Sequence, residues 1–172
     1  APGSNNGTSW ENAFREARSA LIAARNGDEV WVASGTYYPD YDPSTQTHTG
    51  NRDMRFKLTS GVRLFGGFSG TESLRSQRDW VANPVILSGD IGTRHEFADN
   101  TRTLMEIESQ HPTTLIEGVV FMLGNANNPE EGGNGIVSGA GGAVHVRGPV
   151  QIRFCSYFGN YAIYGGAIYG VN

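Results

Sequence analysis

Charged residues and cysteine are scarce in this sequence, and each scarcity excludes a class of protein. The 172 residues include one cysteine, Cys155, so the chain has no internal disulfide framework. Charged residues make up 17% of the chain, which is below the usual quarter, and the formal net charge is -4 at pH 7. Lys57 is the only lysine. An acidic chain with so few cations lacks the positive surface that nucleic-acid binding requires.

Long apolar runs are also missing. No stretch approaches the roughly 18 apolar residues that a membrane-spanning helix needs. The chain does not open with a charged segment followed by an apolar run, so we interpret it as starting in mature protein. Residues 1–8 are small and polar, which fits either the start left after removal of an export signal or a linker.

Glycine, in contrast, is abundant. The 24 glycines amount to about double the ordinary share of roughly 7%, which makes helix bundles and coiled coils unfavourable. One helix is nevertheless predicted over residues 10–26. Ser9 is placed to cap it, Gly27 to end it, and apolar residues recur at intervals of three and four along it. Its apolar stripe predicts a helix that covers a core.

After Gly27 the pattern changes to short apolar or alternating runs separated by Gly, Pro, Asn and Asp, which is typical of many short strands. The predicted strands are residues 29–33, 55–58, 62–65, 85–87, 104–108, 115–121, 143–146, 151–154 and 167–169. No second helical pattern separates these strands, which disfavours alternating strand and helix units.

An internal repeat gives the strongest indication of architecture. Gly141-Gly142-Ala143-Val144 returns 24 positions later as Gly165-Gly166-Ala167-Ile168. A period of this size indicates stacked coils, each supplying about the same set of short strands.

Several stretches resemble secreted bacterial right-handed parallel β-helix proteins, including polymorphic outer-membrane proteins and related surface proteins with the pectin-lyase-like fold. The stretches that carry the resemblance are Gly7-Thr8-Ser9-Trp10, Asn12-Ala13-Phe14, Gly27-Asp28-Glu29-Val30-Trp31-Val32-Ala33, Gly35-Thr36-Tyr37-Tyr38-Pro39, Leu64-Phe65-Gly66-Gly67-Phe68, Gly70-Thr71-Glu72, Gln77-Arg78-Asp79-Trp80, Ile86-Leu87-Ser88-Gly89-Asp90 and the two repeat copies. The resemblance implies export, display at the cell surface or outer envelope, and a coiled β fold. It implies no particular reaction.

We therefore expect an all-β fold, a right-handed parallel β-helix of five or six coils with an N-terminal capping α-helix. Residues 1–27 would form the N-terminal segment and cap, and residues 28–172 the coils. A solenoid end exposes apolar interior and unpaired strand edges. Nothing comparable to the helix follows the last repeat, so we expect further coils, a protein partner or self-association to cover that end.

Two sets of residues raise the question of catalysis on glycans. Glu106 and Glu108 lie two apart on a predicted strand, so both carboxylates should point outward about 6.7 Å apart, a separation typical of inverting glycosidases. A lyase would need a base and a cation, for which Arg147, Arg153 and His145 are outward candidates. Solvated outer-face side chains are the alternative interpretation of both sets.

Other side chains suggest binding rather than catalysis. Tyr37, Tyr38, Tyr41, Tyr161 and Tyr164 could form an aromatic surface that binds sugars or a protein. The acidic residues Asp40, Asp42, Asp53 and Asp90 are weak calcium candidates, because no dense Asp-x-Asp-x-Asp-Gly run is present. The histidines lack zinc-ligand spacing, and we expect no cofactor.

These observations favour a non-catalytic, exported structural or adhesive protein at the bacterial cell surface or in an extracellular assembly. A polysaccharide-active lyase or glycoside hydrolase, or a glycan-binding module, is the alternative. An enzyme predicts acids and arginines converging in a groove, whereas a display scaffold predicts outer faces without such clusters.

Overall fold

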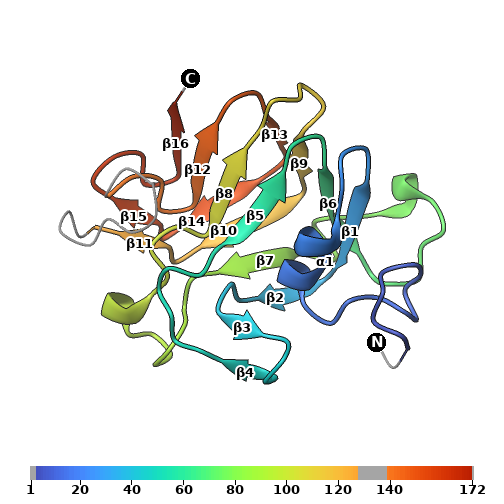
Figure 1. The fold of residues 1–172 in the computed structure, drawn as a ribbon, viewed down its shortest axis with the longest axis horizontal. Helices are drawn as coiled ribbons and strands as arrows, with labels where there is room; N and C mark the ends of the chain where they lie inside the picture. The colour runs from blue at the N-terminus through green and yellow to red at the C-terminus, as the bar shows by residue number, and fades with distance from the viewer. Residues whose placement is uncertain (1–2, 128–138, 172) are drawn as a thin grey trace.

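The fold consists of short parallel strands arranged in sheets, with one helix (Figure 1). The computed structural model describes residues 3–127 and 139–171. Three sheets have four parallel strands each. The first contains β1 (Glu29–Ala33), β6 (Arg63–Phe68), β9 (Leu115–Glu117) and β13 (Gln151–Arg153). The second contains β2 (Gly35–Tyr37), β7 (Val85–Ser88), β10 (Val119–Met122) and β14 (Ser156–Phe158). The third contains β5 (Phe56–Thr59), β8 (Met105–Glu108), β12 (Val144–Arg147) and β16 (Ile168–Val171).

Two small sheets and three helical segments complete the described chain. Strand β11 (Asn125–Ala126) pairs in parallel with β15 (Tyr161–Ala162), whereas β3 (Tyr41–Asp42) and β4 (Thr47–His48) are antiparallel. The helix α1 is Ala17–Ala23, and the 3-10 turns η1 and η2 are Arg75–Gln77 and Phe97–Asp99.

The three large sheets surround one hydrophobic core, because alternate side chains of each strand point inward. From the first sheet the core contains Val30, Val32, Leu64 and Ile116; from the second, Val85, Leu87, Val119 and Phe121; from the third, Phe56, Leu58, Met105, Ile107, Val144 and Val146. In the third sheet Phe56, Met105, Val144 and Ile168 follow one another in register. Side chains of the intervening positions point to the outer faces.

Glycine allows the chain to pass from one sheet to the next within a single residue. The predicted strand 115–121 is in fact two strands, β9 and β10, separated by Gly118. Gly118 has a φ of 72°, which a residue with a side chain rarely adopts. The apolar run therefore contributes to two sheets rather than one.

The predicted fold class was wrong. We expected a single right-handed β-helix of five or six coils, whereas the strands form three separate parallel sheets of four strands, accompanied by one helix. The antiparallel pair of β3 and β4 also interrupts any uniform winding. The repeat at residues 141 and 165 relates two segments near the end of the sequence. It does not predict how the preceding residues are divided into strands.

The predicted helix was also too long. Residues 10–16 are not helical, and α1 begins after Glu16, which has extended backbone angles and makes no side-chain cap. Trp10 instead packs against Trp31 and Phe68, with ring centroids 6.4 and 5.5 Å away. The apolar side chain at position 10 therefore contacts the first sheet and is not part of the apolar face of a helix.

The short helix still covers part of the core. Ala17 and Leu21 are buried, and α1 packs against β5 and β1, the first strands of their sheets. In Figure 1, α1 lies beside β1 and β5, and β16 lies at the other side of its sheet.

Candidate functional site

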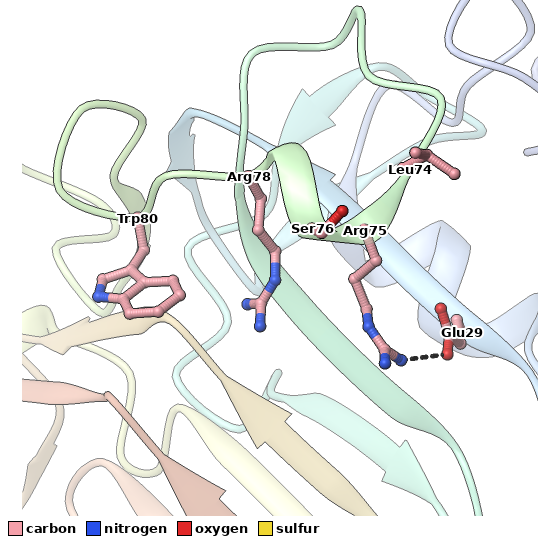
Figure 2. A pocket seen from close by; sticks show the side chains of 6 residues that line it. All are labelled: Glu29, Leu74, Arg75, Ser76, Arg78 and Trp80. Atoms are coloured by element: carbon pink, nitrogen blue, oxygen red, sulfur yellow. Dashed lines mark hydrogen bonds and ion pairs between the residues drawn. The ribbon is translucent and has the colours of Figure 1, made fainter.

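A shallow cleft on the outer face of the first sheet brings cations and aromatic rings together (Figure 2). Its volume is about 510 Å³, and its lining residues are Glu29, Leu74, Arg75, Ser76, Arg78 and Trp80. All of these except Glu29 come from the connection between β6 and β7. In Figure 2 the guanidinium groups of Arg75 and Arg78 lie between Trp80 and Glu29. We call this region the cation–aromatic cleft.

Local hydrogen bonds give the connection its shape. The Glu72 carboxylate accepts bonds from the backbone N–H groups of Ser69, Gly70 and Thr71. Desolvation opposes ionisation of Glu72, but these bonds outweigh it and lower its pKa to about 2. The Gln77 side chain accepts from two further backbone N–H groups and so fixes the turn that carries Arg75.

Both arginines of the cleft are held over one buried ring. The guanidinium carbons of Arg75 and Arg78 lie 4.7 and 5.0 Å from the centroid of Phe65, which is 2% exposed. Arg75 also bonds to the Glu29 carboxylate at 2.6 Å, and Arg78 bonds to Glu117. Cation–π contact and ion pairing together position the two cations.

Trp80 extends the cleft with an aromatic surface. Its ring stacks on Phe154 with a centroid distance of 5.0 Å, and the Arg78 guanidinium lies 5.1 Å from its centroid. A Cβ atom added at Gly67 would lie 2.8 Å from the backbone nitrogen of Trp80. The absent side chain at this position therefore lets the connection lie close to the sheet. The cleft offers guanidinium donors beside a flat apolar ring, a combination suited to a polar ligand with an apolar face.

A second cluster of charged groups lies on the outer face of the third sheet. Lys57, Glu106, His145 and Tyr169 occupy the same register position on β5, β8, β12 and β16. The Glu106 carboxylate lies 3.3 Å from Lys57 Nζ and 3.9 Å from Arg55. Alternation placed Glu106 on the outer face correctly, but its neighbours cover it, and its side chain is only 7% exposed.

Of the other catalytic candidates, only His145 shares the register position of Glu106. Glu108 is exposed and bonds to Arg147 at 2.9 Å. Arg153 lies on β13 in the first sheet, where it donates to the Gln151 side chain. Of the two arginines proposed for lyase chemistry, Arg147 lies on β12 in the same sheet as the glutamates, whereas Arg153 belongs to a different sheet.

His145 was named in the sequence only as an outer-face candidate, but it is the most unusual member of this cluster. Its side chain is completely buried, stacks on Tyr169 at 5.6 Å, and has no hydrogen-bond partner for either ring nitrogen. Desolvation, reinforced by the positive charge of Arg147, lowers the pKa of His145. The ring is therefore held in the neutral form.

The five tyrosines do not form one aromatic surface. Tyr37 donates to the Ala33 carbonyl and is half-buried. Tyr38 and Tyr41 both contact His48, with ring centroids 5.5 and 5.3 Å away.

The other two tyrosines belong to the C-terminal part of the chain. Tyr161 packs against Phe97, and Tyr164 packs against Tyr169. The proposed set is thus divided between two separate groups.

The calcium candidates are each satisfied within their own surroundings. Asp40 is fully buried and accepts from the Gly50 N–H, with His48 Nδ1 at 3.0 Å. Asp42 accepts hydrogen bonds from Ser44, which lower its pKa.

Asp53 and Asp90 are similarly engaged. Asp53 pairs with Arg102, and Asp90 accepts from the His95 N–H. Within residues 3–127 and 139–171, no group of three or more His, Cys, Asp or Glu side chains is placed to hold a metal ion.

The last strands of the three large sheets form a third region of interest. Among the residues that the structure describes, β13, β14 and β16 each pair on one side only. Nine large hydrophobic side chains are exposed in the described chain, and six of them lie between residues 154 and 168. These six are Phe154, Phe158, Tyr161, Ile163, Tyr164 and Ile168. We call this end the open edge.

Comparison with known proteins leaves the family open. No family model, no curated protein and no solved structure matches the chain. In the described part of the chain, no helix has the length and hydrophobicity required to cross a membrane.

Proposed function

We propose that the protein is a non-catalytic structural and adhesive module of the bacterial cell surface or of an extracellular assembly. In this proposal the open edge binds a protein partner by strand addition. Main-chain hydrogen bonds supply affinity in such contacts, and the flanking side chains supply specificity.

The open edge is the observation that carries this proposal. Among the described residues, the last strand of each large sheet pairs on one side only, and six of the nine exposed large hydrophobic side chains lie between residues 154 and 168. Exposed edges combined with apolar side chains are typical of interaction sites, because soluble proteins otherwise protect them.

The charged groups support binding rather than catalysis. Glu106 is buried between Arg55 and Lys57, and Glu108 is paired with Arg147. A glycosidase acid must be free to donate a proton to the glycosidic oxygen, whereas the 7% exposed Glu106 carboxylate is engaged by two cations.

A labelled strand tests the proposal directly. The probe is a fluorescent peptide with the sequence of residues 151–171, which contains the three edge strands. We expect its anisotropy to rise on addition of the protein, and Ile168→Lys in the protein to weaken binding about tenfold or more. Ile22→Lys is the matched control, because Ile22 is also an exposed isoleucine but lies in α1. Unchanged anisotropy at all protein concentrations would refute strand addition.

Turnover of a glycan would refute the non-catalytic part of the proposal. Neutral and uronate-containing polysaccharides are the substrates to screen. We expect the wild-type protein to release no product from these polysaccharides beyond what a folded Glu106→Gln variant releases.

Glycan binding at the cation–aromatic cleft is a second candidate function. It is supported by the position of Arg75 and Arg78 beside the Trp80 ring, where a sugar could stack while its oxygens accept hydrogen bonds. Titration calorimetry with neutral and uronate-containing oligosaccharides tests it. Binding should be lost in Trp80→Ala and retained in Val81→Ala, whose side chain is 82% exposed. Equal binding by both variants would exclude the cleft.

A further inference from the structure

We propose that the cation–aromatic cleft binds an extended peptide segment of a partner protein, in which an acidic side chain lies between two apolar ones. This inference is separate from strand addition at the open edge, and it competes with glycan binding for the same cleft. It follows from an unused hydrogen-bonding edge of Arg75, from the charge of the cleft and from the apolar side chains on either side of the arginines.

Arg75 presents a hydrogen-bonding edge to the cleft. Its Nη1 donates to the Glu29 carboxylate at 2.6 Å, whereas its Nε and Nη2 have no hydrogen-bond partner among residues 3–127 and 139–171. The side chain lines the cleft and is 45% exposed. Two parallel N–H groups of a guanidinium match the two oxygens of one carboxylate. Arg75 can therefore bind a carboxylate of a ligand while it keeps its bond to Glu29.

Neighbouring side chains hold Arg75 in position before a ligand binds. Its guanidinium lies over the buried Phe65 ring, 4.7 Å from the centroid. Its partner Glu29 is itself fixed, because Arg63 lies 3.2 Å from one carboxylate oxygen and Trp31 Nε1 donates to the other at 2.9 Å. A cation that is already ordered loses little conformational entropy when a ligand binds.

The ion pairs around the cleft leave positive charge in excess. Glu29 pairs with Arg63 and Arg75, and Glu117 pairs with Arg78. Three arginines therefore meet two carboxylates in this network. The chain as a whole is acidic, with a formal net charge of -4, so the cleft differs in sign from the rest of the molecule. Electrostatic complementarity favours an anionic ligand at this place.

Apolar side chains on both sides of the arginines favour a peptide as this ligand. In Figure 2, Leu74 lies on one side of the two guanidinium groups and the Trp80 ring on the other. Leu74 is 60% exposed, and its aliphatic side chain offers no hydrogen bond to a sugar but can pack against an apolar side chain of a peptide. A carboxylate at the end of a chain would leave one of the two apolar sides unused. The acidic group therefore belongs within the peptide, with an apolar residue before and after it.

Titration calorimetry of the intact protein with a synthetic peptide tests this inference. The probe is acetyl-Gly-Phe-Glu-Phe-Gly-amide, whose blocked ends leave one charge and whose symmetrical flanks suit either chain direction. We expect saturable binding that weakens about tenfold or more when glutamine replaces the glutamate, because a hydrogen-bonded charge is lost. The peptide acetyl-Gly-Gly-Phe, which ends in a free carboxylate, should also bind more weakly than the probe.

Two pairs of variants assign the binding to the cleft, with circular dichroism to verify that each is folded. Arg75→Gln should weaken binding of the probe about tenfold or more. Its matched control is Arg15→Gln, which removes the same charge from an exposed arginine outside the cleft. Leu74→Ser should weaken binding about threefold or more through lost apolar contact, and the exposure of Leu74 protects this variant against misfolding. Its control, Val81→Ser, should bind as the wild type does, because Val81 is 82% exposed and does not line the cleft.

The outcomes separate this inference from the other proposals. Equal binding of the glutamate and glutamine peptides would overturn it, as would unchanged binding in a folded Arg75→Gln variant. A wild-type protein that binds uronate-containing or neutral oligosaccharides but not the peptide would overturn it and assign the cleft to glycans. A protein that binds neither would overturn both uses of the cleft and leave strand addition at the open edge standing.

Discussion

The two ends of the large sheets differ in how well their apolar side chains are buried. At the end formed by β1, β2 and β5, the helix α1 buries Ala17 and Leu21 against the core. At the open edge, Ile168 and Phe158 stay largely exposed, although they belong to strands of the same kind. Strand pairing alone therefore does not protect the core of such sheets. Protection needs a further element, which α1 supplies at the end formed by β1 and β5.

The largest expected effect contrasts two positions of one inner row. Phe56 on β5 is fully buried, whereas Ile168 on β16 is 41% exposed. We expect Phe56→Ala to lower the free energy of unfolding by about 3–5 kcal/mol. Ile168→Ala should cost less, about 1–2 kcal/mol, because 41% of the Ile168 surface stays in contact with water after folding. Urea denaturation measures both. Similar losses would mean that the open edge is already covered.

A smaller effect concerns the helix that covers the other end. Leu21 is 2% exposed and Ile22, its neighbour in α1, is 60% exposed. Leu21→Ala should lower the free energy of unfolding by about 2–3 kcal/mol, whereas Ile22→Ala should change it by less than about 0.5 kcal/mol. Urea denaturation of the two variants checks the difference. If Leu21→Ala costs no more than Ile22→Ala, α1 does not protect the core.

Glycines give a third, still smaller contrast between interior and edge. A Cβ atom at Gly142 would lie 2.5 Å from the Tyr161 carbonyl oxygen and 2.7 Å from that of Gly166, but one at Gly170 would meet nothing within 4 Å. Gly142→Ala should therefore cost about 1–3 kcal/mol through overpacking. Gly170→Ala should stay within about 0.5 kcal/mol of wild type. Thermal unfolding ranks the two, and equal melting temperatures would contradict the described approach of the strands.

The smallest expected effect is a dependence on pH at His145. Burial lowers its pKa in the folded protein, so the unfolded chain takes up the proton first as pH falls below the ordinary value of 6.5. Stability should be fully present above that value and decrease as pH falls towards the lower pKa of the folded state. Unfolding free energies at pH 7.5 and 5.5 measure the decrease.

A substitution at position 145 tests whether this pH dependence of stability comes from the His145 ring. The groups whose charges act on His145 are Arg55 on the chain just before β5, Glu106 and Glu108 on β8, and Arg147 on its own strand. His145→Phe should reduce the decrease in stability. An unchanged decrease in His145→Phe would assign the effect to other groups.

Local pattern was sufficient to find most of the strands. The alternation in Glu29–Ala33 located β1 with its observed bounds, and the predicted strand 85–87 differs from β7 by one residue. Strands β2 and β14 were not predicted, because three residues are too short to show an alternation. Short strands are defined by their neighbours in the sheet, which a single sequence does not reveal.

Side-chain direction was predicted better than side-chain environment. The outward direction of Glu106 follows from alternation, but its burial depends on Lys57 of β5 and on Arg55 just before it, about fifty residues earlier in the chain. The cation–aromatic cleft was missed for the same reason. The spacing of Arg75, Arg78 and Trp80 within one connection was a usable signal. Nothing local indicated that Phe65 would lie beneath both cations.

The single lysine has a practical consequence for surface chemistry. Lys57 lies on β5, at the far side of its sheet from β16, and its side chain is 72% exposed. Apart from the terminal amine, it is the only primary amine on the chain. Amine coupling at Lys57 would therefore attach the protein to a sensor surface through the outer face of its third sheet.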